Sequence, residues 1–257
     1  MTPVSLAIRD LAVDLGGRSV VSGLTLDLTG GTLVALVGPN GAGKTSVLRA
    51  LVGLLPHRGT ISLDGSPVGT LPPRERARRI AYLPQGHEAH WPLPARDIVA
   101  LGRVPHGAPD PTRLPARDAE IVGEAMRLTD TTHLADRPVT ALSGGERARV
   151  ALARVFAVEA PVILADEPTA ALDPRHQLAV MSALRRAADG GALAVAVTHD
   201  LGLAARFGDH VAVMDAGRLA AFGIPEEALA PAILRDVFGV DAFRAEHRGD
   251  PVLVPWS

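Results

Sequence analysis

The apolar positions along the chain change pattern several times, and each pattern predicts a different kind of element. Between residues 4 and 37, short runs of alternating apolar and polar residues are separated by Gly-Gly pairs, as in antiparallel strands. Near-continuous apolar runs, typical of strands buried on both faces of a sheet, occur at 32–38, 161–167 and 192–198. Helical apolar spacing occurs at 44–55, 116–128, 145–157 and 174–188. This alternation of buried strands and helices predicts an α/β fold with a parallel sheet.

The remaining segments carry weaker patterns. Residues 59–65 indicate a further strand, and 210–223 a hairpin centred on Asp215–Gly217. The tail from residue 225 is expected to be helical and to end in a short strand, PVLV. Frequent prolines after residue 86, followed by helical patterns, indicate a helical lobe inserted into the α/β domain.

These patterns predict one domain of 257 residues with three parts. The nucleotide-binding α/β core would come from 1–85 and 157–223 and include an N-terminal antiparallel β subdomain. The inserted helical subdomain would span 86–156, and a helical and strand tail 224–257.

Composition narrows the classes of protein to consider. Apolar residues make up 47% of the chain and aromatic residues 3%, which suits a packed α/β protein and argues against disorder. The formal net charge of −2 gives no electrostatic basis for nucleic-acid binding. The absence of cysteine excludes disulfides and thiolate metal sites and fits a reducing compartment. The N-terminus does not resemble a signal peptide, and no apolar run approaches the ~18 residues of a membrane span.

The stretch GPNGAGKTS contains Lys44, the only lysine of the chain. It stands between a buried strand and a helical pattern, the context in which G-x-x-x-x-G-K-T forms a phosphate-binding loop. Glycines let backbone N–H groups turn toward an anion, and the helix start adds its positive end. A compact ammonium fits between phosphate oxygens where a planar guanidinium would not, and Thr45 offers a hydroxyl to Mg²⁺. We therefore predict a nucleoside triphosphate site formed by Gly38, Pro39, Asn40, Gly41, Ala42, Gly43, Lys44, Thr45 and Ser46.

A pair of acidic residues ends the apolar strand VILADE. We expect Asp166 to reach the magnesium shell through water, and Glu167 to act as general base for the attacking water. An apolar strand followed by two acids is common by itself. Together with the phosphate loop it predicts hydrolysis of ATP with Mg²⁺.

The stretch TALSGGERARVALARVF (140–156) combines two signals. Ser143 and Glu146 have the spacing of a capping box before an amphipathic helix. Gly144 and Gly145 between them leave backbone N–H groups bare at a helix start, which indicates a second anion site. This combination resembles the ATP-binding-cassette (ABC) ATPases, whose signature LSGGQ reads here as Leu142–Glu146, with glutamate in the last place.

The resemblance continues in order over nearly the whole chain. Gln85 in AYLPQG is similar to the glutamine of the loop that links nucleotide to the transmembrane partner, Asp173 to the D-loop aspartate, and His199 to the switch histidine that contacts the γ-phosphate. The family implies a phosphate-loop NTPase (RecA-like) core. It also implies catalytic roles for Lys44, Gln85, Glu167 and His199, and metal ligation by Thr45, Gln85 and Asp166.

In that family two ATPase subunits pair head to tail, so Ser143, Gly144, Gly145 and Glu146 would act on nucleotide held by the other subunit. The resemblance implies a second nucleotide-binding subunit as partner, which we expect to be an identical copy although the sequence does not decide this. It also implies two transmembrane permease subunits and a peripheral location on the cytoplasmic face of the cell (inner) membrane. Residues 85–107 and the tail are similar to the importer ATPases for ferric siderophores, haem and vitamin B12. Such importers also use a periplasmic or lipid-anchored substrate-binding protein.

One position departs from the family pattern. The aromatic residue that usually stacks on adenine corresponds to Leu15, and no aromatic residue precedes Tyr82. Base–aromatic stacking is worth about 1–3 kcal/mol, so we expect a weaker grip on the base and looser selectivity between ATP and GTP. Leu15 and Val20 would offer an aliphatic surface instead.

Two further stretches invite a functional interpretation. His87-Glu88-Ala89-His90 could suggest a metal site, but the histidines are three residues apart rather than four, and flanking prolines argue against a helix. We expect these residues to shape the surface that meets the membrane partner. The arginines of RERARRI are expected to form a solvated helix face, with lipid head groups or a partner loop as the alternative.

Other functional classes stay open. A soluble cassette ATPase of DNA repair or ribosomes usually carries two cassettes or coiled-coil insertions, and neither occurs here. A phosphate-loop kinase would use Asp166 and Glu167 for phosphoryl transfer, but the signature and His199 argue against it. A metal-ion importer and a separate-chain exporter are compatible with the motifs. The cargo cannot be named from the sequence.

Overall fold

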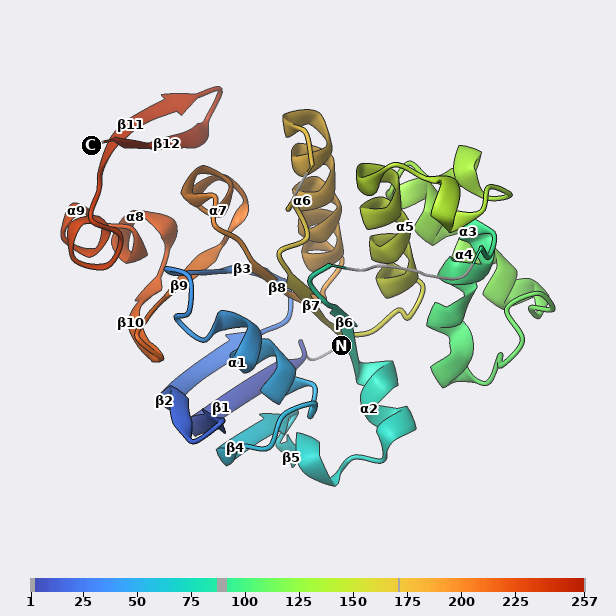
Figure 1. The fold of residues 1–257 in the computed structure, drawn as a ribbon, viewed down its shortest axis with the longest axis horizontal. Coiled ribbons are helices and arrows are strands. Elements are labelled where there is room, and N and C mark those ends of the chain that lie inside the picture. The colour runs from blue at the N-terminus through green and yellow to red at the C-terminus, as the bar shows by residue number, and fades with distance from the viewer. Residues whose placement is uncertain (1–2, 87–91, 171, 257) are drawn as a thin grey trace. The chain divides into compact units, whose positions relative to one another are not determined.

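The computed structural model describes residues 3–86, 92–170 and 172–256. They form two compact units, the first from 1–71 and 185–257, the second from 72–184 (Figure 1). The predicted boundaries of the helical subdomain and the tail stay predictions.

An antiparallel sheet opens the first unit. Its order is β2-β1-β4-β5, with β1 (Ser5–Leu15), β2 (Arg18–Thr29), β4 (Arg58–Leu63) and β5 (Ser66–Pro67), and a 3₁₀ turn, η1 (Val68–Thr70), follows. Apolar side chains alternate with polar ones along β1, and Ile8, Leu11 and Val13 are at most 1% exposed. The predicted N-terminal antiparallel subdomain is confirmed.

The second sheet of this unit carries the phosphate loop. Strand β3 (Thr32–Val37) lies between β8 (Leu193–Val197) and β9 (His210–Asp215) and is parallel to both. Strand β10 (Arg218–Gly223) pairs with β9 in the predicted hairpin. Every side chain of β8 is buried, as the continuous apolar run predicts for a central parallel strand.

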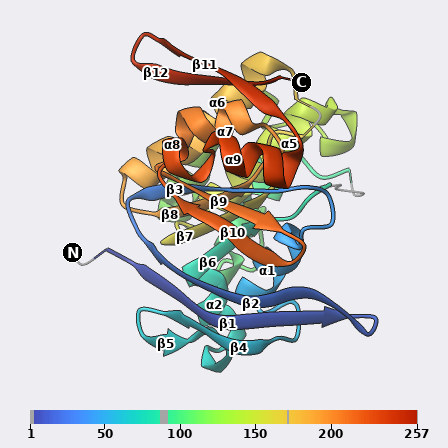
Figure 2. The same cartoon turned by 90° about the vertical axis from the view of Figure 1, so that its left-hand side faces the viewer.

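Helices cover both faces of this sheet. Helix α1 (Lys44–Leu51) follows β3, and α7 (Leu201–Phe207) follows β8. Leu36, Leu48 and residues of the antiparallel sheet enclose one apolar core. Figure 2 shows the antiparallel sheet at the bottom, the β3 sheet above it, and α7 and α8 above that.

The tail contains one strand more than predicted. Helices α8 (Pro225–Ala228) and α9 (Pro231–Ile233) and a π-helical turn, η5 (Leu234–Phe238), precede a hairpin of β11 (Asp241–His247) and β12 (Asp250–Trp256). The helical start of the tail and its final strand, PVLV within β12, are therefore confirmed, but the strand that pairs with it, β11, was not predicted. Strand β11, DAFRAEH, was missed because nearly all its side chains are exposed and it has few apolar residues to alternate.

The second unit is mainly helical. Its strands β6 (Ile80–Leu83) and β7 (Val162–Asp166) are parallel. Its helices are α2 (Pro73–Arg79), α3 (Ala95–Ala100), α4 (Ala116–Leu128), α5 (Gly144–Phe156) and α6 (Pro174–Asp189). The last residues of α6 belong to the first unit. The 3₁₀ segments of the second unit are η2 (Leu101–His106), η3 (Thr132–Leu134) and η4 (Val139–Ala141). Helices α3, α4 and α5 lie side by side and share a core that includes Val99, Met126 and Val150 (Figure 1).

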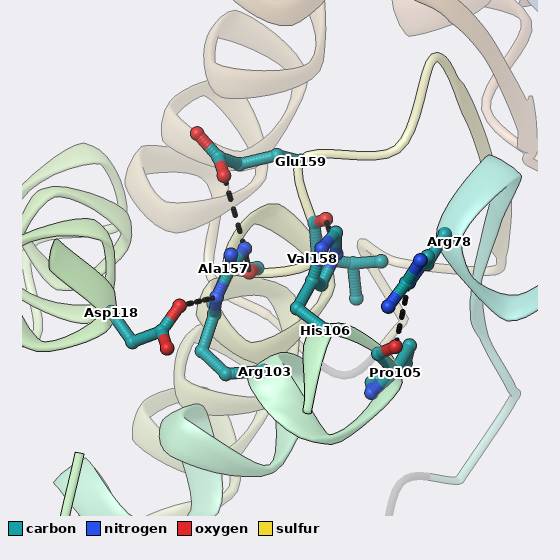
Figure 3. Close-up of polar contacts among 8 residues, drawn as sticks. All are labelled: Arg78, Arg103, Pro105, His106, Asp118, Ala157, Val158 and Glu159. Carbon is teal, nitrogen blue, oxygen red and sulfur yellow. Dashed lines mark hydrogen bonds and ion pairs between the residues drawn. The ribbon is translucent and has the colours of Figure 1, made fainter. Parts of the chain in front are cut away.

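A buried arginine holds this helical cluster together (Figure 3). Arg103 is 4% exposed, and its Nε donates a hydrogen bond to Asp118 Oδ1 at 2.7 Å. Its Nη1 donates to Ala157 O at 2.8 Å and to Glu159 Oε2 at 3.0 Å. Because a buried charge is stable only with partners, these contacts fix η2 against α4 and the C-terminal end of α5.

Further polar contacts join η2 to its neighbours (Figure 3). His106 Nε2 donates to Val158 O at 2.8 Å, and the Nε atoms of Arg74 and Arg78 donate to Pro105 O at 2.8 and 2.7 Å. The prediction of a purely solvated arginine face is therefore incomplete, since these two exposed side chains also hold η2.

The histidines at 87 and 90 lie outside the described residues, so the structure tests no role for them. Among the residues that are described, no three or more His, Cys, Asp or Glu side chains are grouped so that they could hold a metal ion. None of the described helices is long and apolar enough to cross a membrane.

Candidate functional site

The phosphate loop connects β3 to α1, and neighbouring backbone encloses two of its glycines. A Cβ atom on Gly38 would lie 2.2 Å from Met214 O, and one on Gly43 would lie 2.5 Å from Val20 O. Backbone carbonyls cannot swing away as side chains do, so both positions require glycine. The loop is thereby held against β9 and β2.

Lys44 is the first residue of α1 and is only 6% exposed. Its Nζ donates to Gly38 O at 2.8 Å and to Pro39 O at 2.9 Å, so the ammonium folds back over the loop. Helix α1 has no side-chain cap and no acidic residue in its first turn. The positive end of the helix and the lysine charge therefore act at the same place, which suits a phosphate group.

His199 lies at the same edge of the sheet as the phosphate loop. It is exposed and follows β8, whose Val197 is paired with Leu36 of β3. The N–H of Thr198 donates to Leu36 O at 3.2 Å, which continues the pairing past the end of the strand. Because parallel strands end at one edge, residues that follow β3 and β8 share that edge.

The end of β7, in the second unit, carries the acidic pair. Asp166 is fully buried, and Tyr82 Oη on the neighbouring β6 donates to its Oδ2 at 3.3 Å. Glu167 has a φ of 51°, a backbone conformation that is uncommon for residues other than glycine and is often found at functional sites. Gln85 Nε2 donates to Glu167 Oε2 at 2.8 Å. The structure thus brings Gln85 and Glu167 together, two residues for which catalytic roles are predicted.

The capping box at the start of α5 is confirmed. Ser143 N–H donates to Glu146 Oε2 at 2.7 Å, and Glu146 N–H donates to Ser143 Oγ at 3.3 Å. The hydrogen bond from the Ser143 backbone is the main reason that the pKa of Glu146 lies below its usual range, so its carboxylate is ionised at neutral pH. A Cβ atom on Gly144 would meet no described atom within 4 Å. No packing inside the described chain therefore requires glycine at that position.

Asp173 performs a local structural task. Its carboxylate accepts a hydrogen bond from His176 N–H at 3.0 Å and contacts His176 Nδ1 at 2.6 Å. The backbone hydrogen bond is the main cause that lowers the pKa of Asp173. The side chain therefore caps the first turn of α6, and its role toward nucleotide stays a prediction.

The two residues predicted to meet the base differ in setting. Leu15 ends β1 and is 40% exposed. Val20 on β2 is half-buried, and its carbonyl faces the position that a Cβ atom on Gly43 would take. Only Val20 is therefore placed directly against the phosphate loop.

Sequence reasoning missed Tyr82 and Arg103. Tyr82, the only tyrosine of the chain, supports Asp166 from a strand 84 positions away in sequence. Arg103 binds Ala157 O across 54 positions. For Tyr82, the only signal in the sequence is that it is the single tyrosine of the chain. For Arg103, no local pattern in the sequence indicates the contact.

Comparison with known proteins supports the motifs. The family model of the ABC transporter matches residues 21–170. The hemin import ATP-binding protein HmuV of Pseudomonas putida is 43% identical over 97% of this chain and 99% of that protein. The HmuV protein of Streptomyces coelicolor is 44% identical over 98% of this chain and 90% of its own length.

Solved structures agree. An inward-facing structure described as a metal-chelate type ABC transporter is 26% identical, with a TM-score of 0.83 over 100% of this chain and 98% of that one. An ADP-bound cassette dimer in a post-hydrolysis state, 24% identical with a TM-score of 0.75 over 86% of this chain and 98% of the other, shares the fold. The predicted phosphate-loop α/β fold with an antiparallel sheet is confirmed. With a family model over more than half of the chain and relatives above 40% identity along nearly all of it, the chain belongs to the ABC transporter family, as one of its ATP-hydrolysing chains.

Proposed function

We propose that this chain is the ATPase subunit of an importer that takes up haem. The observation that carries the proposal is the extent of the similarity to proteins named hemin import ATP-binding proteins, which includes the tail and not only the cassette motifs. Ferric siderophores and cobalamin remain the second candidate cargo, because the metal-chelate type structure matches along the whole chain.

We propose that the phosphate loop binds the triphosphate of ATP. Lys44 is already inside the loop, where its charge can offset that of the β- and γ-phosphates. The hydroxyl of Thr45 and the carboxylate of Asp166 are hard oxygen ligands that suit Mg²⁺, with Gln85 as a further ligand. When bound, Mg²⁺ would neutralise charge that develops on the transferred phosphoryl group.

The proposed hydrolytic step depends on Glu167. Its carboxylate, held by Gln85, accepts a proton from the water that attacks the γ-phosphorus. His199 donates a hydrogen bond to a γ-phosphate oxygen.

A second copy of the chain would complete the site. We propose that Ser143, Gly144 and Gly145 of one subunit bind the nucleotide held by the other, with Glu146 and Asp173 at the same interface. The open space at Gly144 and the exposed capping box are consistent with a surface that another subunit covers. Two membrane permease subunits, a substrate-binding protein and a place on the cytoplasmic membrane face belong to the same proposal.

Growth on defined iron sources tests the cargo. A strain that lacks the gene is complemented with the wild-type chain or with Lys44→Ala, and haem, a ferric siderophore or an inorganic iron salt is the only iron source. We expect the wild type alone to restore growth on haem, with no difference on inorganic iron. A cobalamin-dependent growth assay is run in parallel. Restoration on the siderophore or cobalamin but not on haem would overturn the haem assignment and leave the ATPase assignment intact.

A further inference from the structure

The tip of the β1–β2 hairpin places an arginine beside Leu15. The two strands turn at Gly16 and Gly17, and Leu15 is paired directly with Arg18. Side chains of directly paired residues lie on the same face of an antiparallel sheet. Leu15 lies two residues beyond Val13 on β1, and the pairing register shifts between Val13, which pairs with Val21, and Asp14.

Strand β2 adjoins the phosphate loop shortly after Arg18. Val21 Cγ2 lies 3.2 Å, and Val20 O 2.5 Å, from the place of a Cβ atom on Gly43. Ser22 N–H donates to Gly217 O at 2.8 Å, and a Cβ atom on Gly217 would lie 2.8 Å from the same Val20 O. Strand β2 is therefore held by both the loop and the β9–β10 turn, and the hairpin tip has a defined place next to the loop.

The Arg18 side chain is exposed and makes no hydrogen bond or ion pair with any residue that the structure describes. Other arginines of the same sheet are paired: Arg9 with Asp27 at 2.7 Å and Arg58 with Asp14 at 2.9 Å. The Arg18 guanidinium is thus not engaged within the described chain, and it lies at the tip of the hairpin whose strand β2 contacts the phosphate loop.

We propose that Arg18 is the base-binding residue of this ATPase, with its guanidinium plane stacked on the purine and Leu15 beside it. This inference rests on the assignment of the chain as an ATPase. A guanidinium is planar and weakly hydrated, and it stacks on bases as aromatic rings do. The Arg18 guanidinium would stack on the base in place of the aromatic residue that this chain lacks. Because stacking contacts the face of the base and not its hydrogen-bonding edge, we expect adenine and guanine to bind about equally well.

Equilibrium titration with ADP, GDP and pyrophosphate tests the assignment, since ADP and pyrophosphate share the loop but only ADP carries a base. We expect Arg18→Ala to weaken both ADP and GDP about fivefold and to leave pyrophosphate unchanged within about twofold. Arg18→Lys keeps the charge but not the plane and should weaken ADP as much as alanine does. Arg18→Tyr should restore ADP binding, and Arg117→Ala, an exposed arginine of α4, is the matched control.

Three results overturn the assignment. An equal loss for ADP and pyrophosphate would show that Arg18 contacts phosphate. Full retention in Arg18→Lys would show that charge rather than stacking matters. Unchanged affinity in Arg18→Ala, with normal ATP hydrolysis by the wild type, would refute the role of Arg18 alone, whereas a wild type that binds none of the ligands would refute the ATPase assignment as well.

Discussion

Helices α1 and α5 both begin at glycine-rich segments, but their starts are built differently. The start of α1 has no side-chain cap, and its loop is held by backbone contacts and by Lys44. The start of α5 is closed by its own side chains, Ser143 and Glu146. Its far end is held by Arg103 through Ala157 O.

The uncapped start of α1 and the capped start of α5 suit different kinds of contact with a nucleotide. An uncapped helix start with an enclosed lysine is arranged to take up an anion without rearrangement. A self-capped start is stable by itself and already carries a carboxylate. In this chain the first therefore suits primary binding of the triphosphate, and the second suits a surface that meets nucleotide only when a partner brings it.

The largest expected effect is the loss of stability on removing Arg103, which holds the C-terminal end of α5. Arg103→Met removes a buried charge and leaves Asp118 and Ala157 O without their donor, so we expect a loss of about 3–5 kcal/mol in the free energy of unfolding. Chemical denaturation measures this loss, with Arg117→Ala as control. A loss below about 1 kcal/mol would show that the buried ion pair does not hold the cluster.

Replacement of the lysine tests the start of α1. Lys44→Ala should lower ATP hydrolysis about 10²–10³-fold, the usual effect of removing a preorganised electrostatic contact. Lys44→Arg should be about as inactive, because a planar guanidinium does not fit between Gly38 O and Pro39 O. Near-normal activity of the arginine variant in a phosphate-release assay would contradict the proposed fit.

Loss of the capping serine should be milder. Ser143→Ala removes the acceptor for Glu146 N–H, and we expect a loss of about 1 kcal/mol in the free energy of unfolding. Ser66→Ala, at an exposed serine of β5, is the control. If both variants unfold at the same denaturant concentration, the cap does not stabilise α5.

The smallest effect concerns pH. Burial is the main cause that lowers the pKa of His106 below 6.5, and nearby Arg103 and Arg78 act in the same direction. The unfolded chain therefore takes up a proton before the folded chain does, so this contribution to stability is complete above pH 6.5 and is lost as the pH falls below it. His106→Gln keeps a donor for Val158 O but cannot titrate. We expect the wild type to lose more stability than this variant between pH 8 and pH 5.5, and equal losses would contradict the role of His106.

Much of the fold followed from sequence, because the informative segments have strong local patterns. Helix α4 has the predicted bounds, and the continuous apolar runs at β3, β7 and β8 mark the central strands. The hairpin strand β11 escaped prediction because it packs few side chains. The apolar pattern of a sequence predicts an element only where that element is buried, because burial is what selects apolar side chains.

The site was predictable to a smaller extent. The glycine spacing of the phosphate loop and the Ser143–Glu146 spacing are local, and the structure has the geometry that each requires. The contact of Tyr82 with Asp166 depends on the pairing of two distant strands, which no local pattern encodes. The unengaged guanidinium of Arg18 likewise becomes visible only when its neighbours are known.

The proposal that α1 binds the triphosphate and that α5 of a second copy completes the site is tested most directly by the molecular mass in solution with and without ATP. In Glu167→Gln the proposed base is removed while nucleotide binding is retained, so ATP should persist between two subunits. Light scattering after size exclusion should then show the mass of one chain without nucleotide and of two chains with Mg²⁺ and ATP, and Ser143→Ala in the same background should weaken the dimer. A variant that stays monomeric with ATP while the wild type hydrolyses it at a normal rate would contradict a site completed by a second copy.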